Sequence, residues 1–285
     1  MSRILLIGTV TLDLVFELDH HPHADEEMRA TALRTCRGGN AANSAVVLAQ
    51  LGQQAEFLGT LADAPETAVI ENDFLRYGVS FDHCPRLPGR PPTSSIYLSQ
   101  GDRSIVHYRE LPELSAQHVS AIPWIQFDWV HAEGRNVSVL QQVLDDVRQH
   151  APHATVSIEL EKHREGIAQL FGRANVLMCS RAFARHYGFD EPHAFLMWMA
   201  SQAPGAVLMQ AWGEGGAYGL DREGVIVHTP AMPPEQVEDT LGAGDTFNAA
   251  VIDATLRGLS MPDVLVEGCR VAGIKCGRQG FDFEW

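Results

Sequence analysis

The chain has 285 residues, of which 36 are acidic and 21 basic, so its formal net charge is −15 at pH 7. This balance argues against a non-specific nucleic-acid partner, because nucleic acids attract basic surfaces. No apolar run reaches the roughly 18 to 20 residues of a membrane span, and the N-terminus lacks a signal-peptide pattern. We therefore expect a cytoplasmic chain with no nucleic-acid or membrane partner, long enough for one large α/β domain or two small ones.

The first predicted element is a buried parallel strand at residues 4–8, a short apolar run bounded by Gly8. Residues 12–18 then alternate with a period of two, which predicts a half-exposed strand. Asp13 comes just past the carboxyl end of the first strand, where open α/β sheets bind ligands. An ordinary turn aspartate explains it equally well, so its position alone does not decide.

The group His20-His21-Pro22-His23 is the one metal-like feature of the sequence. Protein zinc sites combine His with Cys or carboxylate ligands. Because none accompanies these histidines at helical spacing, we interpret the group as an exposed loop.

The next predicted helix begins in the string Arg-Gly-Gly-Asn-Ala-Ala-Asn and stops at Gly52. Its glycines, among them Gly39, allow a ligand to approach the backbone closely. Asn40 and Asn43 share one face of the first turn, and two carboxamides can both donate to and accept from a polyol. Helix capping accounts for one of them but not for both, so the pair favours sugar binding.

Beyond a strand at 55–59 and a helix at 66–77 ended by Gly78, the pattern changes. Residues 94–99 and 103–108 alternate on either side of a turn at Gln100-Gly101-Asp102, as in a β-hairpin. Together with an alternating run at 28–35, they predict a few antiparallel strands inserted at about 10–36 and 90–112. So small a sheet is not stable alone, and we expect it to cover a site, to pair with a partner, or both.

The β–α rhythm resumes in the second half, with strands predicted at 127–132, 154–160, 175–179 and 205–210 and a helical stripe at 139–147. The last of these strands leads into Gly213, Glu214, Gly215 and Gly216. A nucleotide could lie there against bare backbone, although the same residues could simply turn a hairpin into residues 225–227. A final helix at 261–276 carries two of the five cysteines. We expect all five cysteines to be reduced, because their number is odd and they show no close pairing.

The string Asp-Thr-Leu-Gly-Ala-Gly-Asp at 239–245 precedes an apolar run that predicts a buried helix. Gly242, Ala243 and Gly244 let the backbone curl at the helix start, where N–H groups without intrahelical partners and the positive end of the helix dipole favour an anion. Asp245 in the same turn can take a proton from an attacking hydroxyl. A lone Gly-x-Gly would be an ordinary capped turn, but here the whole string is intact.

Two of these strings resemble the signatures of the ribokinase-like (PfkB) sugar kinases: the one at 239–245, and Gly38-Gly39-Asn40 with Asn43 about 200 residues earlier. Further strings at 131–136, 211–217 and 271–282 resemble the ketohexokinase subgroup of that family, so that the resemblance covers essentially the whole chain. It implies an α/β fold with a mostly parallel central sheet, helices on both faces and a small antiparallel β lid. Residues 1–285 would form a single kinase domain.

The resemblance also implies roles. Asp13, Gly39, Asn40 and Asn43 would hold a neutral ketose and Asp245 would be the base, while Asp25 resembles an aspartate that a neighbouring subunit's lid lends to the sugar site. The nucleotide would meet the following residues: Arg103 at the phosphates, Gly213, Glu214, Gly215, Gly216, Gly242 and Gly244 along ATP, and Phe247 and Cys276 near the nucleotide base. The lids of two chains would interlock in a homodimer.

The reaction implied is transfer of the ATP γ-phosphoryl group, with Mg²⁺, to the C1 hydroxyl of a furanose ketose such as fructose; K⁺ is a further candidate ion. The Asn-x-x-Glu motif that helps to organise Mg²⁺ in many relatives is absent, since Cys179-Ser180-Arg181-Ala182 stands there. Glu161 and Glu165 are the candidates to replace its missing carboxylate. Another sugar specificity within the family and a non-catalytic sensor on the same fold are the alternatives. A dinucleotide-dependent oxidoreductase would need a Gly-x-Gly-x-x-Gly after the first strand, which is missing.

Overall fold

A computed structural model describes residues 1–99 and 101–283. Its main sheet has eight strands in the order β14-β13-β12-β11-β10-β9-β1-β4, of which the six from β12 to β4 are parallel. These strands are β1 (Arg3–Ile7), β4 (Gln54–Leu58), β9 (Trp129–Glu133), β10 (Thr155–Leu160), β11 (Val176–Ser180), β12 (Val207–Ala211), β13 (Ala217–Leu220) and β14 (Ile226–Thr229). The parallel strands are buried almost throughout because helices cover both faces of the sheet.

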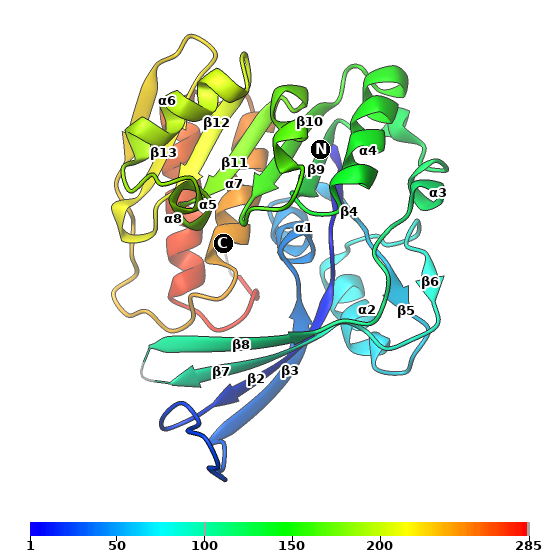
Figure 1. Ribbon diagram of the computed structural model, residues 1–285, viewed down its shortest axis with the longest axis vertical. Helices are drawn as coiled ribbons and strands as arrows, with labels where there is room; N and C mark the ends of the chain where they lie inside the picture. Colours follow the sequence, from blue (N-terminus) through cyan, green and yellow to red (C-terminus); the bar gives the residue numbers. More distant parts are fainter. Residues whose placement is uncertain (100, 284–285) are drawn as a thin grey trace.

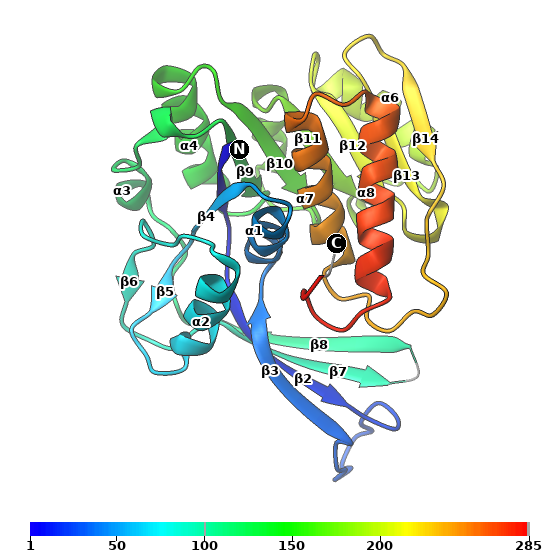
Figure 2. The same ribbon diagram turned by 180° about the vertical axis from the view of Figure 1, so that it is seen from behind.

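Two separate hydrophobic cores lie on the two faces. Figure 2 shows one layer, α1 (Asn40–Gln50), α2 (Thr67–Tyr77), α7 (Ala243–Leu256) and α8 (Met261–Cys276). Figure 1 shows the other, α3 (Ala116–Val119), α4 (Val137–His150), α5 (Arg181–His186) and α6 (Pro192–Gln202), joined by the 3₁₀ segment Ile167–Arg173. The predicted parallel sheet with helices on both faces is therefore confirmed. Helices α3, α5 and α6 were not predicted. Helices α3 and α5 have only 4 and 6 residues, and α6 is apolar around most of its circumference and shows no one-sided stripe.

A second sheet projects below the main body (Figures 1 and 2). We call it the lid; its strands are β2 (Thr11–Glu17), β3 (Ala32–Gly38), β7 (Thr93–Ser99) and β8 (Asp102–Tyr108), in the order β3-β2-β7-β8. The outer pairs are antiparallel as expected, whereas β2 and β7 pair in parallel because both run outward from the body. Residue Gln100 of the predicted hairpin turn lies outside the described residues. A small third sheet joins β5 (Leu61–Ala62) to β6 (Arg86–Leu87).

Strand β3 differs from the strand predicted at 28–35, since residues 28–30 belong to the loop that precedes it. Pairing with β2 decides its bounds: it extends from Ala32, opposite Glu17, to Gly38, opposite Thr11. Alternation along the chain alone does not define where a strand finds its partner.

The two faces of the lid have different surroundings, because successive side chains of a strand point to opposite faces. The inner face, which carries Asp13, faces the main body and lines a cavity there. By the register, the outer face carries seven apolar side chains, of which Leu12 is buried: Leu12, Leu14, Phe16, Leu33, Tyr97, Val106 and Tyr108. Of these, Leu33, Val106 and Tyr108 are 58–63% exposed. The lid thus presents an uncovered apolar face to solvent.

All five cysteines are free, as predicted. Among the described residues, no helix is long and apolar enough to cross a membrane.

Candidate active site

A cavity of about 440 Å³ lies where the inner face of the lid meets the carboxyl ends of the main-sheet strands and the start of α7. This is the edge at which open α/β sheets bind ligands. The structure brings there the following residues singled out from the sequence: Asp13, Gly39, Asn40, Asn43, Arg103, Glu161, Gly242, Ala243, Gly244 and Asp245. They come from segments up to about 230 residues apart in the chain, so tertiary packing alone assembles them.

Gly242 precedes helix α7 as its N-cap and has φ 78°, a left-handed conformation that favours glycine. A Cβ at this position would lie 2.2 Å from Cζ of Phe281, so only glycine fits beneath that ring. At Gly244, by contrast, an added Cβ would meet no atom within 4 Å. The first turn of α7 is therefore open toward the cavity. The N–H of Ala243 already donates to the backbone oxygen of Thr240 at 3.3 Å, which leaves the N–H groups of Gly242 and Gly244 to meet an anion.

Asp245 is the acidic residue of that first turn and is only 7% exposed. Its Oδ2 accepts a hydrogen bond from Nδ2 of Asn43 at 2.6 Å, and its backbone oxygen accepts one from Oγ of Ser44 at 2.9 Å. Burial raises the pKa of Asp245 to about 7, against the lowering effect of the Asn43 hydrogen bond. The carboxyl group is therefore close to half-protonated at neutral pH.

Arg37 orients the Asn43 amide that contacts Asp245. Its guanidinium donates to Oδ1 of Asn43 and forms an ion pair with Asp73, each at 2.6 Å. The same group lies 5.7 Å and 5.4 Å from the ring centres of Phe74 and Phe281. Because Arg37 takes the carbonyl oxygen of Asn43, the amide nitrogen must face Asp245.

In the string at residues 37–43, Gly39 has φ 102° and an added Cβ would lie 2.1 Å from the Thr9 backbone oxygen. Asn40 donates to Glu159 at 3.1 Å and to Glu161 at 3.3 Å. Its amide therefore lies beside the carboxylates that line the cavity.

Asp13 projects from β2 and accepts a hydrogen bond from the Thr11 hydroxyl at 2.6 Å. Burial raises its pKa, while hydrogen bonds from Thr11 and Ser94 and the charge of Arg37 lower it. At Gly38, an added Cβ would come within 2.0 Å of the Asp13 carboxylate, so this glycine makes room for it.

Two buried carboxylates beside the cavity, Glu133 and Glu159, were not predicted as site residues. Glu133 accepts from the backbone N–H of Ala41 at 2.9 Å and so caps α1, which lacks a side-chain cap of its own. Glu159 accepts from Asn248 at 3.0 Å. Burial, then the charges of Asp245 and Glu133, raise the pKa of Glu159 well above its ordinary value. Their sequence signal is a carboxylate at or next to the last residue of a buried parallel strand.

This group of carboxylates fits a divalent cation, since Glu159 and Glu161 line the cavity next to the start of α7 and carboxylate oxygens are ligands that Mg²⁺ takes. Glu165, the other predicted substitute, is exposed and does not line the cavity.

Other predicted residues lie outside this cavity. Gly213–Gly215 form an exposed turn between β12 and β13, and Gly216 packs on β14, where a Cβ would be 2.0 Å from the Thr229 backbone oxygen. The alternative interpretation as a hairpin turn thus describes the local geometry, but the turn leads into β13 and not directly into residues 225–227. Cys276, at the end of α8, accepts through its backbone oxygen from the N–H of Asp239 at 3.2 Å.

Phe247 is 4% exposed and enclosed between α7 and α8, where a Cβ on Gly268 would lie 2.6 Å from its ring. Asp25 lies in the loop between β2 and β3 with φ 62°, exposed and away from the cavity of its own chain.

Comparison with known proteins decides the family. The model of the pfkB family carbohydrate kinases matches residues 1–284. The chain belongs to the PfkB carbohydrate kinase family. It is 39% identical to mouse ketohexokinase over 292 residues, covering 99% of this chain and 98% of that one. It is 28% identical to Bacillus subtilis ribokinase, covering 98% and 96% of the two chains.

Solved structures agree with the PfkB fold. Ribokinase from Giardia lamblia superposes with a TM-score of 0.84 at 16% identity, covering 98% of this chain and 94% of that one. Arabidopsis thaliana ribokinase, solved in complex with ribose and ATP, gives 0.82 at 20% identity, with 98% and 94% covered. This PfkB protein is an ATP-dependent sugar kinase, and kinases of the family generally use ATP with Mg²⁺.

Proposed function

We propose that this kinase phosphorylates the C1 hydroxyl of a furanose ketose, fructose first, with Asp245 as the general base. The observation that carries the proposal is the contact between Asn43 and Asp245, 2.6 Å apart at the open start of α7. It joins the two family strings, 202 residues apart in the chain, into one site. The 39% identity with mouse ketohexokinase supports the choice of sugar.

Asp245 has the properties that a base needs. A general base works best with a pKa near the operating pH, and burial raises that of Asp245 to about 7. It accepts the proton of the sugar hydroxyl as that oxygen attacks the γ-phosphorus. The bond from the γ-phosphorus to the bridging oxygen breaks, and ADP leaves.

Charge that develops on the transferred group faces the N–H groups of Gly242 and Gly244, and Arg103 adds a cation from the lid. Mg²⁺ neutralises phosphate charge when it is bound, and Glu159 and Glu161 are the side chains that would hold it. Placement of Gly213–Gly216, Phe247 and Cys276 along ATP stays a prediction, as does any role of K⁺.

The sugar site offers a carboxylate at Asp13 and carboxamides at Asn40 and Asn43. Arg37 already pairs with Asp73, which supports a preference for neutral sugars over sugar acids. Sites that hydrogen-bond a hydroxyl reject analogues that lack it strongly. Deoxy-fructoses should therefore lose more kcat/KM than tagatose or sorbose.

We infer further that two lids pair through their outer faces. The apolar side chains there would be removed from water against a second copy, which stabilises the pair; Leu33, Val106 and Tyr108 are the most exposed of them. Asp25 faces away from its own cavity, which fits a role in the partner's sugar site. The single kinase domain across 1–285 belongs to this proposal too.

The test is a panel of fructose, tagatose, sorbose, ribose, adenosine and 2-keto-3-deoxygluconate in a coupled assay of ADP release, with the phosphorylated position read by NMR. We expect the highest kcat/KM for fructose and phosphate on carbon 1. A lead by ribose, adenosine or the sugar acid would refute the ketose assignment and leave the sugar-kinase assignment standing. For the dimer, light scattering is decisive: a mass near 31 kDa with full activity would rule it out.

A further inference from the structure

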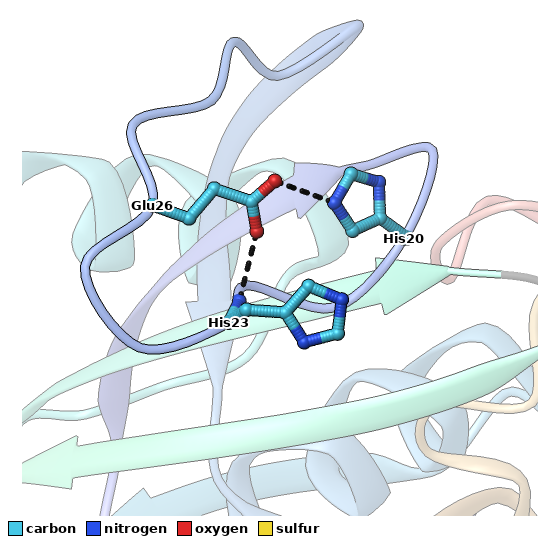
Figure 3. Close-up of side chains that lie close together, drawn as sticks. All are labelled: His20, His23 and Glu26. Carbon is cyan, nitrogen blue, oxygen red and sulfur yellow. Dashed lines mark hydrogen bonds and ion pairs between the residues drawn. The ribbon is translucent and has the colours of Figure 1, made fainter.

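The loop between β2 and β3, at the tip of the lid, gathers three potential metal ligands (Figure 3). His20, His23 and Glu26 each offer a ligand atom, and these atoms all lie within 4.8 Å of one another. Among the described residues this is the one group of three or more His, Cys, Asp or Glu side chains that meets that distance. The carboxylate that the sequence pattern did not associate with the histidines is supplied here by Glu26.

The loop holds Glu26 between the two histidines. One carboxylate oxygen lies 2.8 Å from Nε2 of His20, and the other accepts from the backbone N–H of His23 at 2.9 Å. Asp25 adopts φ 62°, which turns the chain back so that the next residue reaches His20. The rings of His20 and His23 are 5.5 Å apart and tilted by 33° rather than stacked face to face.

We propose that His20, His23 and Glu26 bind a borderline divalent transition-metal ion, of which Zn²⁺ is the type. Two imidazole nitrogens and one carboxylate oxygen are a donor set that Zn²⁺ takes at roughly 2.0–2.2 Å. Ligand atoms around such an ion lie roughly 3.4 Å apart, so the present spacing closes by small side-chain rotations. All three residues are exposed, and water completes the coordination.

The donor set separates this site from the one for Mg²⁺. Mg²⁺ prefers oxygen ligands and keeps much of its water, so imidazole pairs select against it. The carboxylates Glu159 and Glu161 line the sugar-kinase cavity and are therefore independent of the lid-tip group.

A bound ion would fix the loop that carries Asp25, since this residue lies between two of the ligands in the chain. That consequence rests on the proposed function, in which Asp25 reaches the partner's sugar. Binding of the metal itself does not depend on it.

The experiment uses the full-length protein freed of metal with a chelator. Co²⁺ is added first and its visible absorption is recorded, and Zn²⁺ is then titrated by calorimetry. We expect one ion per lid tip, with binding weakened at least about tenfold in each of His20→Gln, His23→Gln and Glu26→Gln. His21→Gln is the matched control, because its side chain is outside the group. His186→Gln controls for the stacked pair His163 and His186, whose ring centres are 4.2 Å apart.

No binding at millimolar Zn²⁺, or binding that survives the three ligand substitutions, would overturn the site, and so would binding that is lost in either control. The consequence for Asp25 has its own readout, the KM for sugar with and without Zn²⁺. Binding that leaves this KM unchanged would refute the link to Asp25, whereas failure of fructose as substrate would bear on the proposed function alone.

Discussion

Replacing Arg37 with Met tests whether the Asp245 carboxyl is set by its surroundings. Methionine is long and unbranched, so it can fill the space between Phe74 and Phe281 while removing the charge and every donor. Asn43 then loses the partner of its carbonyl oxygen and its amide can rotate away from Asp245. Both effects take away influences that lower the pKa of Asp245.

The direction in which the pH profile of kcat moves follows from the protonation state of Asp245. Asp245 acts as a base only when deprotonated, so kcat should rise with pH through its pKa of about 7. Burial and the charges of Glu161 and Glu133 raise this pKa, while Asn43 and Arg37 lower it. Without Arg37 the profile therefore moves to higher pH.

The size of the effect follows from the fraction of Asp245 that is deprotonated. If its pKa rises from about 7 to about 8, which corresponds to about 1.4 kcal/mol, the deprotonated fraction at pH 7 falls from about one half to about one tenth. The variant should then lose about fivefold in kcat at pH 7 and recover most of it near pH 9. Breaking the pair with Asp73 and two ring contacts should also cost about 2–4 kcal/mol of unfolding free energy.

The assay is kcat at saturating ATP and sugar over the range of about pH 6 to 9.5, with the unfolding free energy measured in parallel. Arg76→Met is the control: Arg76 lines a neighbouring cavity with Arg37 and lies over the Tyr77 ring, but pairs with Asp282 rather than Asn43. Its profile should not move. A destabilised Arg37→Met protein whose pH profile matches that of the wild type would refute the reasoning and leave Arg37 a purely structural residue.

Three further substitutions test the other parts of the site. Asp245→Asn should lower kcat by about 10² to 10⁴ while calorimetry still detects ATP and sugar; a variant retaining more than about a tenth of the wild-type kcat would exclude Asp245 as the base. Arg103→Ala should raise the KM for ATP and lower kcat because a phosphate-facing cation is lost, and unchanged ATP kinetics would make it a surface residue. Gly242→Ala should cost about 2–4 kcal/mol in denaturant unfolding, from its φ of 78° and the clash with Phe281. Gly52→Ala, at φ 90° with no atom within 4 Å, should lose only the unfolding free energy that comes from backbone strain. Equal losses in the two variants would exclude a contribution from the clash with Phe281.

The features that the sequence determined are local ones. A strand buried on both faces is mostly apolar, so the parallel strands could be predicted from runs such as residues 4–8. Gly242 could likewise be predicted to precede a helix, since a left-handed backbone at a helix start favours glycine over residues that carry a side chain. The motif around Asp245 is contiguous, and contiguous residues keep their spacing whatever the rest of the chain does.

Only the tertiary structure decided which side chains from distant segments of the chain meet in the site. Asn43 reaches Asp245 across 202 residues, and Asn40 reaches Glu159 across 119. No periodicity encodes such pairs, because their distance is set by how helices pack on the sheet rather than by chain spacing.

The same reason explains the differences from prediction. Pairing with β2 moved the start of β3 to Ala32, and packing against α8 enclosed Phe247. A left-handed Asp25 brought Glu26 back to the histidines of the lid loop. Burial then acted on the assembled carboxylates: it raised the pKa of Asp245 to about 7, which the sequence could not determine because desolvation depends on everything that surrounds the group.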